Sequence, residues 1–268
     1  MEQPFSQRAF IDQNLPAIKS DQRFIGVAVG GSYLSNQMDD YSDLDLIIVV
    51  DDYHHPHVMM EREEIVSHFG QLLASYTGDP AGDPNQITCL YEKPLLHVDV
   101  LFCRLDHFKH HRQEDPEILW ERGHRLSRTL LSHPMSWDQF DPQWLEDRFW
   151  LWTHYLAAKL ARGEIFEVID GLSFVRVQVL APLARFNQGM TPRGVRFLET
   201  ALPGLYGEFC ETVPKGCSVE AARHALNACV ELYTELREQL AVGIHRRRKA
   251  EKAVLTFLEQ VSCRQVAY

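Results

Sequence analysis

Residues 30–50 read GGSYLSNQMDDYSDLDLIIVV, and this stretch decides the fold. Its Gly-Gly-Ser turn, residues 30–32, closes an apolar run at residues 23–29 (RFIGVAV), which has the length and composition of a strand. An Asp-x-Asp pair opens the next apolar run, residues 43–50 (DLDLIIVV), which is rich in β-branched side chains and too short for a typical helix. The stretch therefore predicts a strand, a glycine turn and a second strand.

Two carboxylates stand at the start of the second predicted strand. Side chains at positions i and i+2 of a strand point to one face, so Asp43 and Asp45 project side by side. A divalent cation relieves the repulsion between them, and Mg²⁺ is normally held by one or two carboxylates plus substrate phosphates. Asp99 is the only charged residue in the apolar run at residues 95–103 (LLHVDVLFC), where a carboxylate is costly unless it is paired or metal-bound. These three residues are the candidate Mg²⁺ ligands.

The glycine turn is the candidate phosphate site. Gly30 and Gly31 let the backbone come close to a ligand, and amide N–H groups together with the Ser32 hydroxyl bind phosphate. Taken singly, each feature has a plainer explanation: a common turn, an exposed strand start, or a hydrogen-bonded buried Asp. The joint arrangement, with a spacing of 11 from Ser32 to Asp43, is far more specific and favours a phosphate cradle facing a metal site.

Periodicity along the rest of the chain predicts two parts. In the first part we expect a helix at 4–19, a helix at 61–76, strands at 86–92 and 95–103, and a short strand at 126–131. In the second part helical stripes cover 145–160, 165–183, 222–240 and roughly 246–261. The pattern predicts an α/β domain at residues 1–140 followed by a helical bundle at residues 141–268.

Charge and composition narrow the classes of function. The net charge of −10 divides into −11 for residues 1–140 and +1 for the remainder, so the acidity belongs to the first part. No run of about 18 apolar residues is present, the N-terminus has no charged-then-apolar leader, and six cysteines form no CxxC pair. We therefore expect a soluble, cytoplasmic protein with reduced, buried thiols and no membrane partner. A nucleic-acid partner is disfavoured, because the one basic cluster, residues 246–249, lies at a helix start.

Residues 30–50 resemble the signature of the nucleotidyltransferase superfamily related to DNA polymerase β, in which Gly-Ser, an Asp-x-Asp pair and a third acidic residue follow in order. The whole layout is similar to the small antibiotic nucleotidyltransferases that act on aminoglycosides and lincosamides. In the second part, residues 148–150 (RFW), 162–164 (RGE) and 169–170 (ID) resemble the streptomycin adenylyltransferase-like and lincosamide enzymes. The resemblance implies an α+β fold, with a mixed-sheet nucleotidyltransferase domain followed by a helical substrate-binding domain.

The resemblance also implies a role for each candidate residue. Asp43 and Asp45 would hold Mg²⁺ against a nucleoside triphosphate, with ATP the commonest donor, and the turn at residues 30–32 would bind its phosphates. Two Mg²⁺ ions would stabilise charge around an in-line α-phosphate. Asp99 would either complete the metal site or act as the general base on the acceptor hydroxyl, and we favour the base.

The implied activity is transfer of a nucleoside monophosphate, AMP from ATP, to a hydroxyl of a small molecule, with release of pyrophosphate. An aminoglycoside- or lincosamide-like acceptor, and hence antibiotic resistance, agrees with the family and with the acidity of the first part. Two alternatives stay open: a protein-modifying adenylyltransferase, and a non-catalytic, antitoxin-like or nucleotide-binding regulatory module. The sequence does not identify the acceptor, and it leaves the oligomeric state undetermined.

The helical part carries further candidates with plain structural explanations. Four aromatic side chains are predicted to pack between helices rather than to form an adenine platform: Trp144, Trp150, Trp152 and Tyr155. Glu146, Asp147 and Asp170 are predicted to be helix-surface charges rather than receivers of substrate amino groups.

Overall fold

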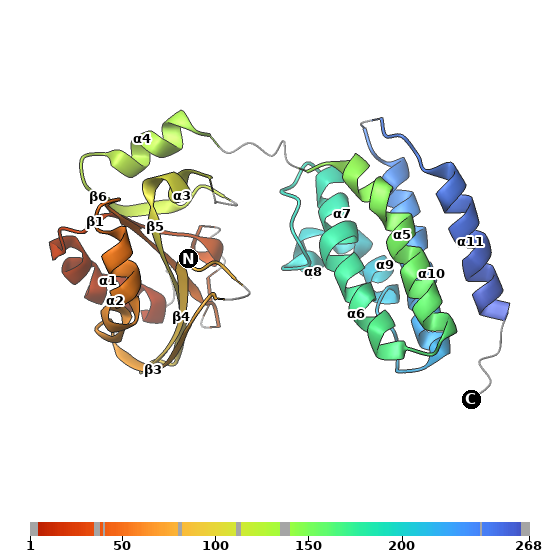
Figure 1. The fold of residues 1–268 in the computed structure, drawn as a ribbon, viewed down its shortest axis with the longest axis horizontal. Coiled ribbons are helices and arrows are strands. Elements are labelled where there is room, and N and C mark those ends of the chain that lie inside the picture. The colour runs from red at the N-terminus through yellow and green to blue at the C-terminus, as the bar shows by residue number, and fades with distance from the viewer. Residues whose placement is uncertain are drawn as a thin grey trace. The chain divides into compact units, whose positions relative to one another are not determined.

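The structure, a computed structural model, describes residues 5–34, 38–39, 41–79, 82–110, 114–134, 140–241 and 243–263. The chain forms two compact units, Met1–Ser136 and Trp137–Tyr268. Figure 1 shows the first unit built around a sheet and the second built from helices. This arrangement confirms the predicted α+β fold class.

The first unit is organised around a six-stranded mixed sheet of order β3-β4-β5-β2-β1-β6. Its strands are β1 (Phe24–Val29), β2 (Leu44–Val50), β3 (Gln71–Thr77), β4 (Gln86–Glu92), β5 (Leu96–Arg104) and β6 (Glu117–Glu121). The central pair, β2 and β5, is parallel, while the other neighbouring pairs are antiparallel. The strands predicted at 23–29, 43–50, 86–92 and 95–103 are confirmed.

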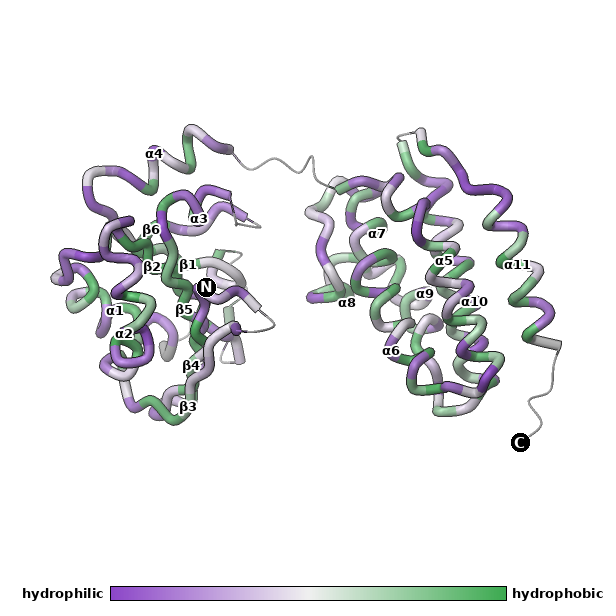
Figure 2. The backbone as a smooth tube through the Cα atoms, in the orientation of Figure 1, coloured by the Kyte–Doolittle hydropathy of each residue, from purple (hydrophilic) through white to green (hydrophobic). Residues whose placement is uncertain are grey.

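One face of this sheet carries the main core of the first unit. Helices α1 (Phe5–Ser20) and α2 (His55–Ser67) pack on it. Alternate strand residues, such as Leu44, Leu46 and Ile48 of β2, turn toward these helices, as the two-residue period of a strand requires. In Figure 2 the central strands are mostly green, because most of their residues are hydrophobic.

The opposite face is covered over only part of its length. Two short helices, α3 (Leu105–His110) and α4 (Arg125–Ser132), pack on it at one end of the sheet (Figure 1). Their core includes Val49 of β2 and Cys103 of β5. Because side chains alternate, Asp45 and Asp99 point to this same face, four residues before Val49 and Cys103 respectively. The acidic positions therefore precede the part of each strand that α3 and α4 cover.

The helix expected at residues 61–76 is wrong in its second half. Helix α2 begins earlier, at His55, and ends at Ser67, after which β3 pairs with β4. The Tyr91 hydroxyl of β4 donates to the Val66 carbonyl at 2.8 Å, and a Cβ on Gly70 would lie 3.2 Å from the Tyr91 ring. Pairing with β4, which local periodicity does not reveal, overrides the helical stripe here.

The strand expected at residues 126–131 is also wrong, because this segment is helix α4. The Glu121 carboxylate accepts from the backbone N–H groups of Leu126 at 2.8 Å and Ser127 at 3.0 Å, which satisfies the first turn of the helix. Leu126 is fully buried against Gly26, where a Cβ would lie 2.5 Å from the leucine Cδ1. The cap from Glu121 of β6 and the packing of Leu126 against Gly26 of β1 thus stabilise residues 125–132 as a helix.

All the regular secondary structure described in the second unit is helical. It contains α5 (Pro142–Ala161), α6 (Ile165–Val175), a π-helical turn η2 (Arg176–Leu180), α7 (Ala181–Asn187), α8 (Leu198–Ala201), a 3₁₀ turn η3 (Pro203–Leu205), α9 (Tyr206–Glu211), α10 (Val219–Glu238) and α11 (Arg248–Cys263). The helices predicted for this part are confirmed, and α5, α6, α7 and α10 share one hydrophobic core. No helix in the described ranges is both long and apolar enough to cross a membrane.

Glu146 differs from the surface charge expected of it. It is fully buried in α5, and its carboxylate accepts hydrogen bonds from Tyr233 at 2.7 Å, Arg237 at 3.3 Å and the backbone N–H of Arg247 at 2.8 Å. Arg237 also pairs with Glu251 of α11 at 2.9 Å. Burial and the bond to Glu146 raise the pKa of Tyr233. Glu146 therefore joins α5, α10 and α11 in a buried ionic network.

The five cysteines whose side chains the structure describes are free thiols. Cys89, Cys103 and Cys229 are buried, as expected, and burial raises the pKa of Cys89 to about 11 and those of the other two to about 12. Cys217 is exposed and Cys210 is half-buried, contrary to the expectation of buried thiols. The three buried thiols are held in the unreactive protonated form.

Candidate functional site

The strand register brings two of the predicted acidic residues together. Asp45 of β2 and Asp99 of β5 are direct partners across the parallel pair at the centre of the sheet. Neighbouring strands lie about 4.8 Å apart and partner side chains share a face, so these two carboxylates are neighbours. Asp43 lies in the segment directly before β2, two residues ahead of Asp45, and all three residues are half-buried. Residues separated by more than fifty positions in sequence thus meet on one face of the sheet.

The predicted phosphate turn lies against one of these carboxylates. The Gly30 N–H donates to the Asp45 carbonyl at 3.0 Å, which continues the β1–β2 pairing into the turn. Gly31 has a positive φ of 63°, and a Cβ on it would lie 1.9 Å from Asp45 Oδ2. Ser32 follows in a short 3₁₀ turn, η1 (Gly31–Tyr33), and is 4% exposed. A side chain at position 31 is therefore incompatible with the observed position of the Asp45 carboxylate.

Asp99 is held by side chains that the sequence did not single out. The Thr88 hydroxyl of β4 donates to Asp99 Oδ1 at 2.5 Å, and His97 Nε2 lies 3.3 Å from the same oxygen. The Gln86 amide donates in turn to the Thr88 hydroxyl at 3.4 Å. The signal that finds these residues is the strand order, because β4 neighbours β5 and places Thr88 opposite Asp99.

The chemistry of this site suits a hard divalent cation. Within the described ranges, no three His, Cys, Asp or Glu side chains are grouped closely enough to hold a metal ion, so the three-carboxylate site stays a prediction. The available donors are carboxylate oxygens on two adjacent strands, and Asp45 Oδ2 occupies the space that a Cβ on residue 31 would need. Oxygen donors of this kind are those that Mg²⁺ prefers, so the donor chemistry of Asp45 and Asp99 suits the cation that the resemblance implies.

The two other acidic candidates of the helical unit, Asp147 and Asp170, lie in surroundings that differ from each other. Asp147 accepts from the Arg247 side chain at 2.8 Å, and this bond lowers the pKa of Asp147. Asp170 is exposed, as expected of a surface charge.

Among the aromatic residues, Trp150 is fully buried, whereas Trp144 is 43% exposed. The packing role is thus confirmed for Trp150, while Trp144 faces a cavity.

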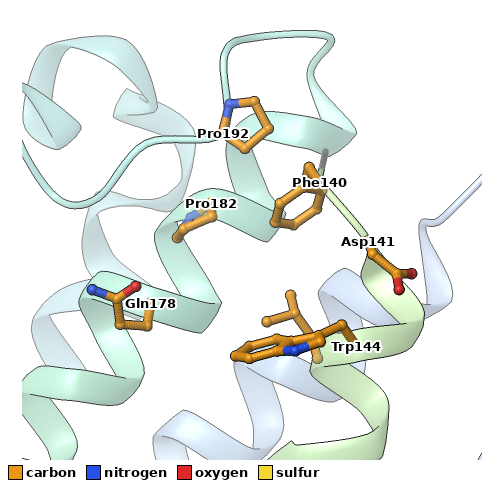
Figure 3. A pocket seen from close by; sticks show the side chains of 7 residues that line it. Phe140, Asp141, Trp144, Gln178, Pro182 and Pro192 are labelled. Carbon is orange, nitrogen blue, oxygen red and sulfur yellow. The ribbon is translucent and has the colours of Figure 1, made fainter. Parts of the chain in front are cut away.

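That cavity lies within the helical unit and has a volume of about 340 Å³. It is lined by Phe140, Asp141, Trp144, Leu145, Gln178, Pro182 and Pro192. Figure 3 shows the Trp144, Phe140 and proline rings around the cavity, with Gln178 on the side opposite Asp141. Gln178 belongs to the π-helical turn η2, and π-helical turns are frequent at functional sites. A lining of aromatic and proline rings suits an organic ring rather than a phosphate group.

The sequence as a whole matches one known family. Residues 6–261 match the family model described as Streptomycin adenylyltransferase. The chain belongs to the streptomycin adenylyltransferase family. This membership makes it a transferase of the nucleotidyltransferase superfamily, and the matched residues run through both units.

This member of the streptomycin adenylyltransferase family is similar to several chains of known structure, of which one serves as the example. It is the nucleotidyltransferase-like protein from Exiguobacterium sibiricum 255-15, with 14% identity and a TM-score of 0.33. The similarity covers 87% of this chain and 76% of that one. None of the curated proteins matches the chain closely enough to count as a relative.

Proposed function

We propose that this protein transfers AMP from ATP to a hydroxyl group of a small molecule and releases pyrophosphate. The observation that carries the proposal is the register of the central strands, which pairs Asp45 with Asp99. The glycine turn against Asp45 and membership of an adenylyltransferase family support it. Residues 1–140 are assigned to nucleotidyl transfer and residues 141–268 to binding of the acceptor.

The nucleotide end of the site is assigned to the Gly-Gly-Ser turn and the Asp-x-Asp pair. Asp43 and Asp45 would hold Mg²⁺, two ions being expected, and bound Mg²⁺ stabilises negative charge on the transferred phosphoryl group and on the leaving pyrophosphate. Backbone N–H groups of Gly30 and Gly31, with the Ser32 hydroxyl, would bind the triphosphate oxygens. Gly31 is required here because a side chain would displace the Asp45 carboxylate.

The acceptor end of the site is assigned to Asp99. Its carboxylate takes the proton from the acceptor hydroxyl as the acceptor oxygen bonds to the α-phosphorus. The bond between the α-phosphorus and the bridging oxygen breaks on the opposite side, and the electron pair leaves with pyrophosphate. Asp99 Oδ1 already accepts from Thr88, so Oδ2 is assigned as the oxygen that receives the proton.

The acceptor class is assigned to aminoglycoside- or lincosamide-like antibiotics, so that the reaction would confer resistance. The name of the family supports the aminoglycoside class. The net charge of −11 on residues 1–140 attracts polycationic molecules. We assign the reaction to the cytoplasm, where ATP is available.

Pyrophosphate release tests this function. The protein is incubated with Mg²⁺, each of the four nucleoside triphosphates, and panels of aminoglycosides, lincosamides, sugars and nucleosides. We expect acceptor-dependent release with ATP and an acceptor mass increased by one AMP. AMP attached to a protein, without small-molecule turnover, would instead support the protein-modifying alternative. Mg²⁺-dependent ATP binding without any turnover would support the regulatory alternative.

A further inference from the structure

A row of three polar residues crosses the centre of the sheet. Thr88 of β4 is the register partner of Asp99 of β5, and Asp99 is the register partner of Asp45 of β2. Register partners share a face of the sheet, so these side chains lie in line on the face that carries the candidate site. Thr88 is therefore placed to act on Asp99 from the side opposite Asp45.

The hydrogen bonds around Thr88 have a fixed direction. A threonine hydroxyl has one proton to donate, and the N–H groups of an amide side chain only donate. Because the Gln86 Nε2 donates to the Thr88 oxygen at 3.4 Å, the Thr88 proton is directed to Asp99 Oδ1, 2.5 Å away. The bond to a charged acceptor is the stronger of the two. The result is a chain of donors that ends on a single carboxylate oxygen.

The contacts at Asp99 are unequal for its two oxygens. Thr88 and His97 both contact Oδ1, so a rotation of the carboxylate would break both contacts. The Asp99 side chain is 23% exposed, so it can be reached from the face of the sheet that carries the candidate site. Threonine suits this role because its β-branched side chain is restricted at χ1, so the hydroxyl keeps its direction.

We propose that Thr88 is a positioning residue for the transfer reaction: it holds Asp99 Oδ1 so that Oδ2 faces the acceptor hydroxyl. This inference rests on the proposed function, in which Asp99 takes the acceptor proton. Thr88 touches neither substrate and acts only through Asp99. Misplacing a reacting group by about 1 Å costs on the order of 100-fold in rate, so loss of this hydrogen bond should reduce kcat.

The test compares two substitutions at one position. Thr88→Val has nearly the same shape without the hydroxyl, and Thr88→Ser keeps the hydroxyl. We expect Thr88→Val to lower kcat by about 10- to 100-fold with an unchanged KM for ATP, and Thr88→Ser to retain most of kcat. The matched control is Thr77→Val on the neighbouring strand β3, which should keep wild-type rates. Wild-type kcat in Thr88→Val, or equal losses in Thr88→Val and Thr88→Ser, would overturn the proposal.

Two further measurements separate this inference from the proposed function. If Asp99→Asn keeps wild-type kcat, the assignment of the base is wrong and the role of Thr88 falls with it. If Asp99→Asn is inactive while Thr88→Val is fully active, only the role of Thr88 is wrong. Crystal structures of the wild type and Thr88→Val give a readout without turnover: we expect the Asp99 carboxylate to rotate in the variant, and an unchanged carboxylate would contradict the proposal.

Discussion

Gly31 and Asp45 approach so closely that a Cβ on residue 31 would lie 1.9 Å from Asp45 Oδ2. The glycine also has a φ of +63°, a backbone conformation that other residues adopt only with strain. The turn predicted to bind phosphate and the carboxylate predicted to bind Mg²⁺ therefore constrain each other directly. A change at either residue should affect the other.

Gly31→Ala should abolish activity by displacing the Asp45 carboxylate. We expect kcat/KM for ATP to fall by more than about 100-fold, as when a preorganised charge-stabilising group is removed. Gly123→Ala is the matched control, because Gly123 has nearly the same φ of +62° and no heavy atom within 4 Å of its added Cβ. Both variants should lose about 1–2 kcal/mol in free energy of unfolding from backbone strain. Only Gly31→Ala should lose activity, and equal activities in the two variants would refute the displacement argument.

Glu146→Gln should destabilise the helical unit. The groups around the Glu146 carboxylate are donors, including the Tyr233 hydroxyl, the Arg237 side chain and the backbone N–H of Arg247. The amide of Gln turns a donor toward donors and removes the charge that pairs with buried Arg237. We expect a loss of about 3 kcal/mol in free energy of unfolding, measured in urea, against less than about 0.5 kcal/mol for exposed Glu235→Gln. Equal stability of the two variants would mean that the network contributes nothing.

Leu126→Ala should destabilise the first unit by about 2–5 kcal/mol, because Leu126 is fully buried between α4 and Gly26 and leaves a cavity there. The control is Leu131→Ala in the same helix, where the leucine is 83% exposed and its loss should cost less than about 0.5 kcal/mol. Chemical unfolding followed by circular dichroism measures both. Similar costs for the two leucines would contradict the burial of Leu126 against Gly26.

Glu121 should make the stability of this helix depend on pH. Burial alone raises the pKa of Glu121, but hydrogen bonds from Ser127 and Leu126 outweigh it, and the pKa lies below the ordinary value of 4.5. A carboxylate whose pKa is lower in the folded state than in the unfolded state stabilises the protein at pH values above the unfolded-state pKa. This stabilisation is lost as the pH falls through the folded-state pKa. The wild type should therefore be more stable than Glu121→Gln at pH 7, and this difference should shrink below about pH 4.5. A difference that is constant with pH would exclude the carboxylate as the cause.

Local patterns in the sequence predicted the parts of the fold that local forces determine. The short apolar run rich in β-branched residues predicted the strand β2 that carries Asp45, and helical periodicity predicted the helices of the second unit. Pairing between distant segments produced the errors: β3 is a strand because it pairs with β4, and α4 is a helix because Glu121 caps it. The same limit applies to the candidate site. A lone Asp99 was visible in the sequence, but its contact with Thr88 depends on strand order, which no local pattern contains.

The most direct test of the central claim measures transfer of labelled AMP from ATP to an acceptor by the wild type and by Asp45→Asn, with Mg²⁺ and after its removal with EDTA. Asp45 lies both against Gly31 and beside Asp99, so the account predicts at least about a 100-fold loss in Asp45→Asn with an unchanged unfolding temperature. Wild-type transfer should stop in EDTA and return when Mg²⁺ is restored. Exposed Asp106→Asn serves as the control and should keep full activity. Wild-type transfer by Asp45→Asn would contradict the account.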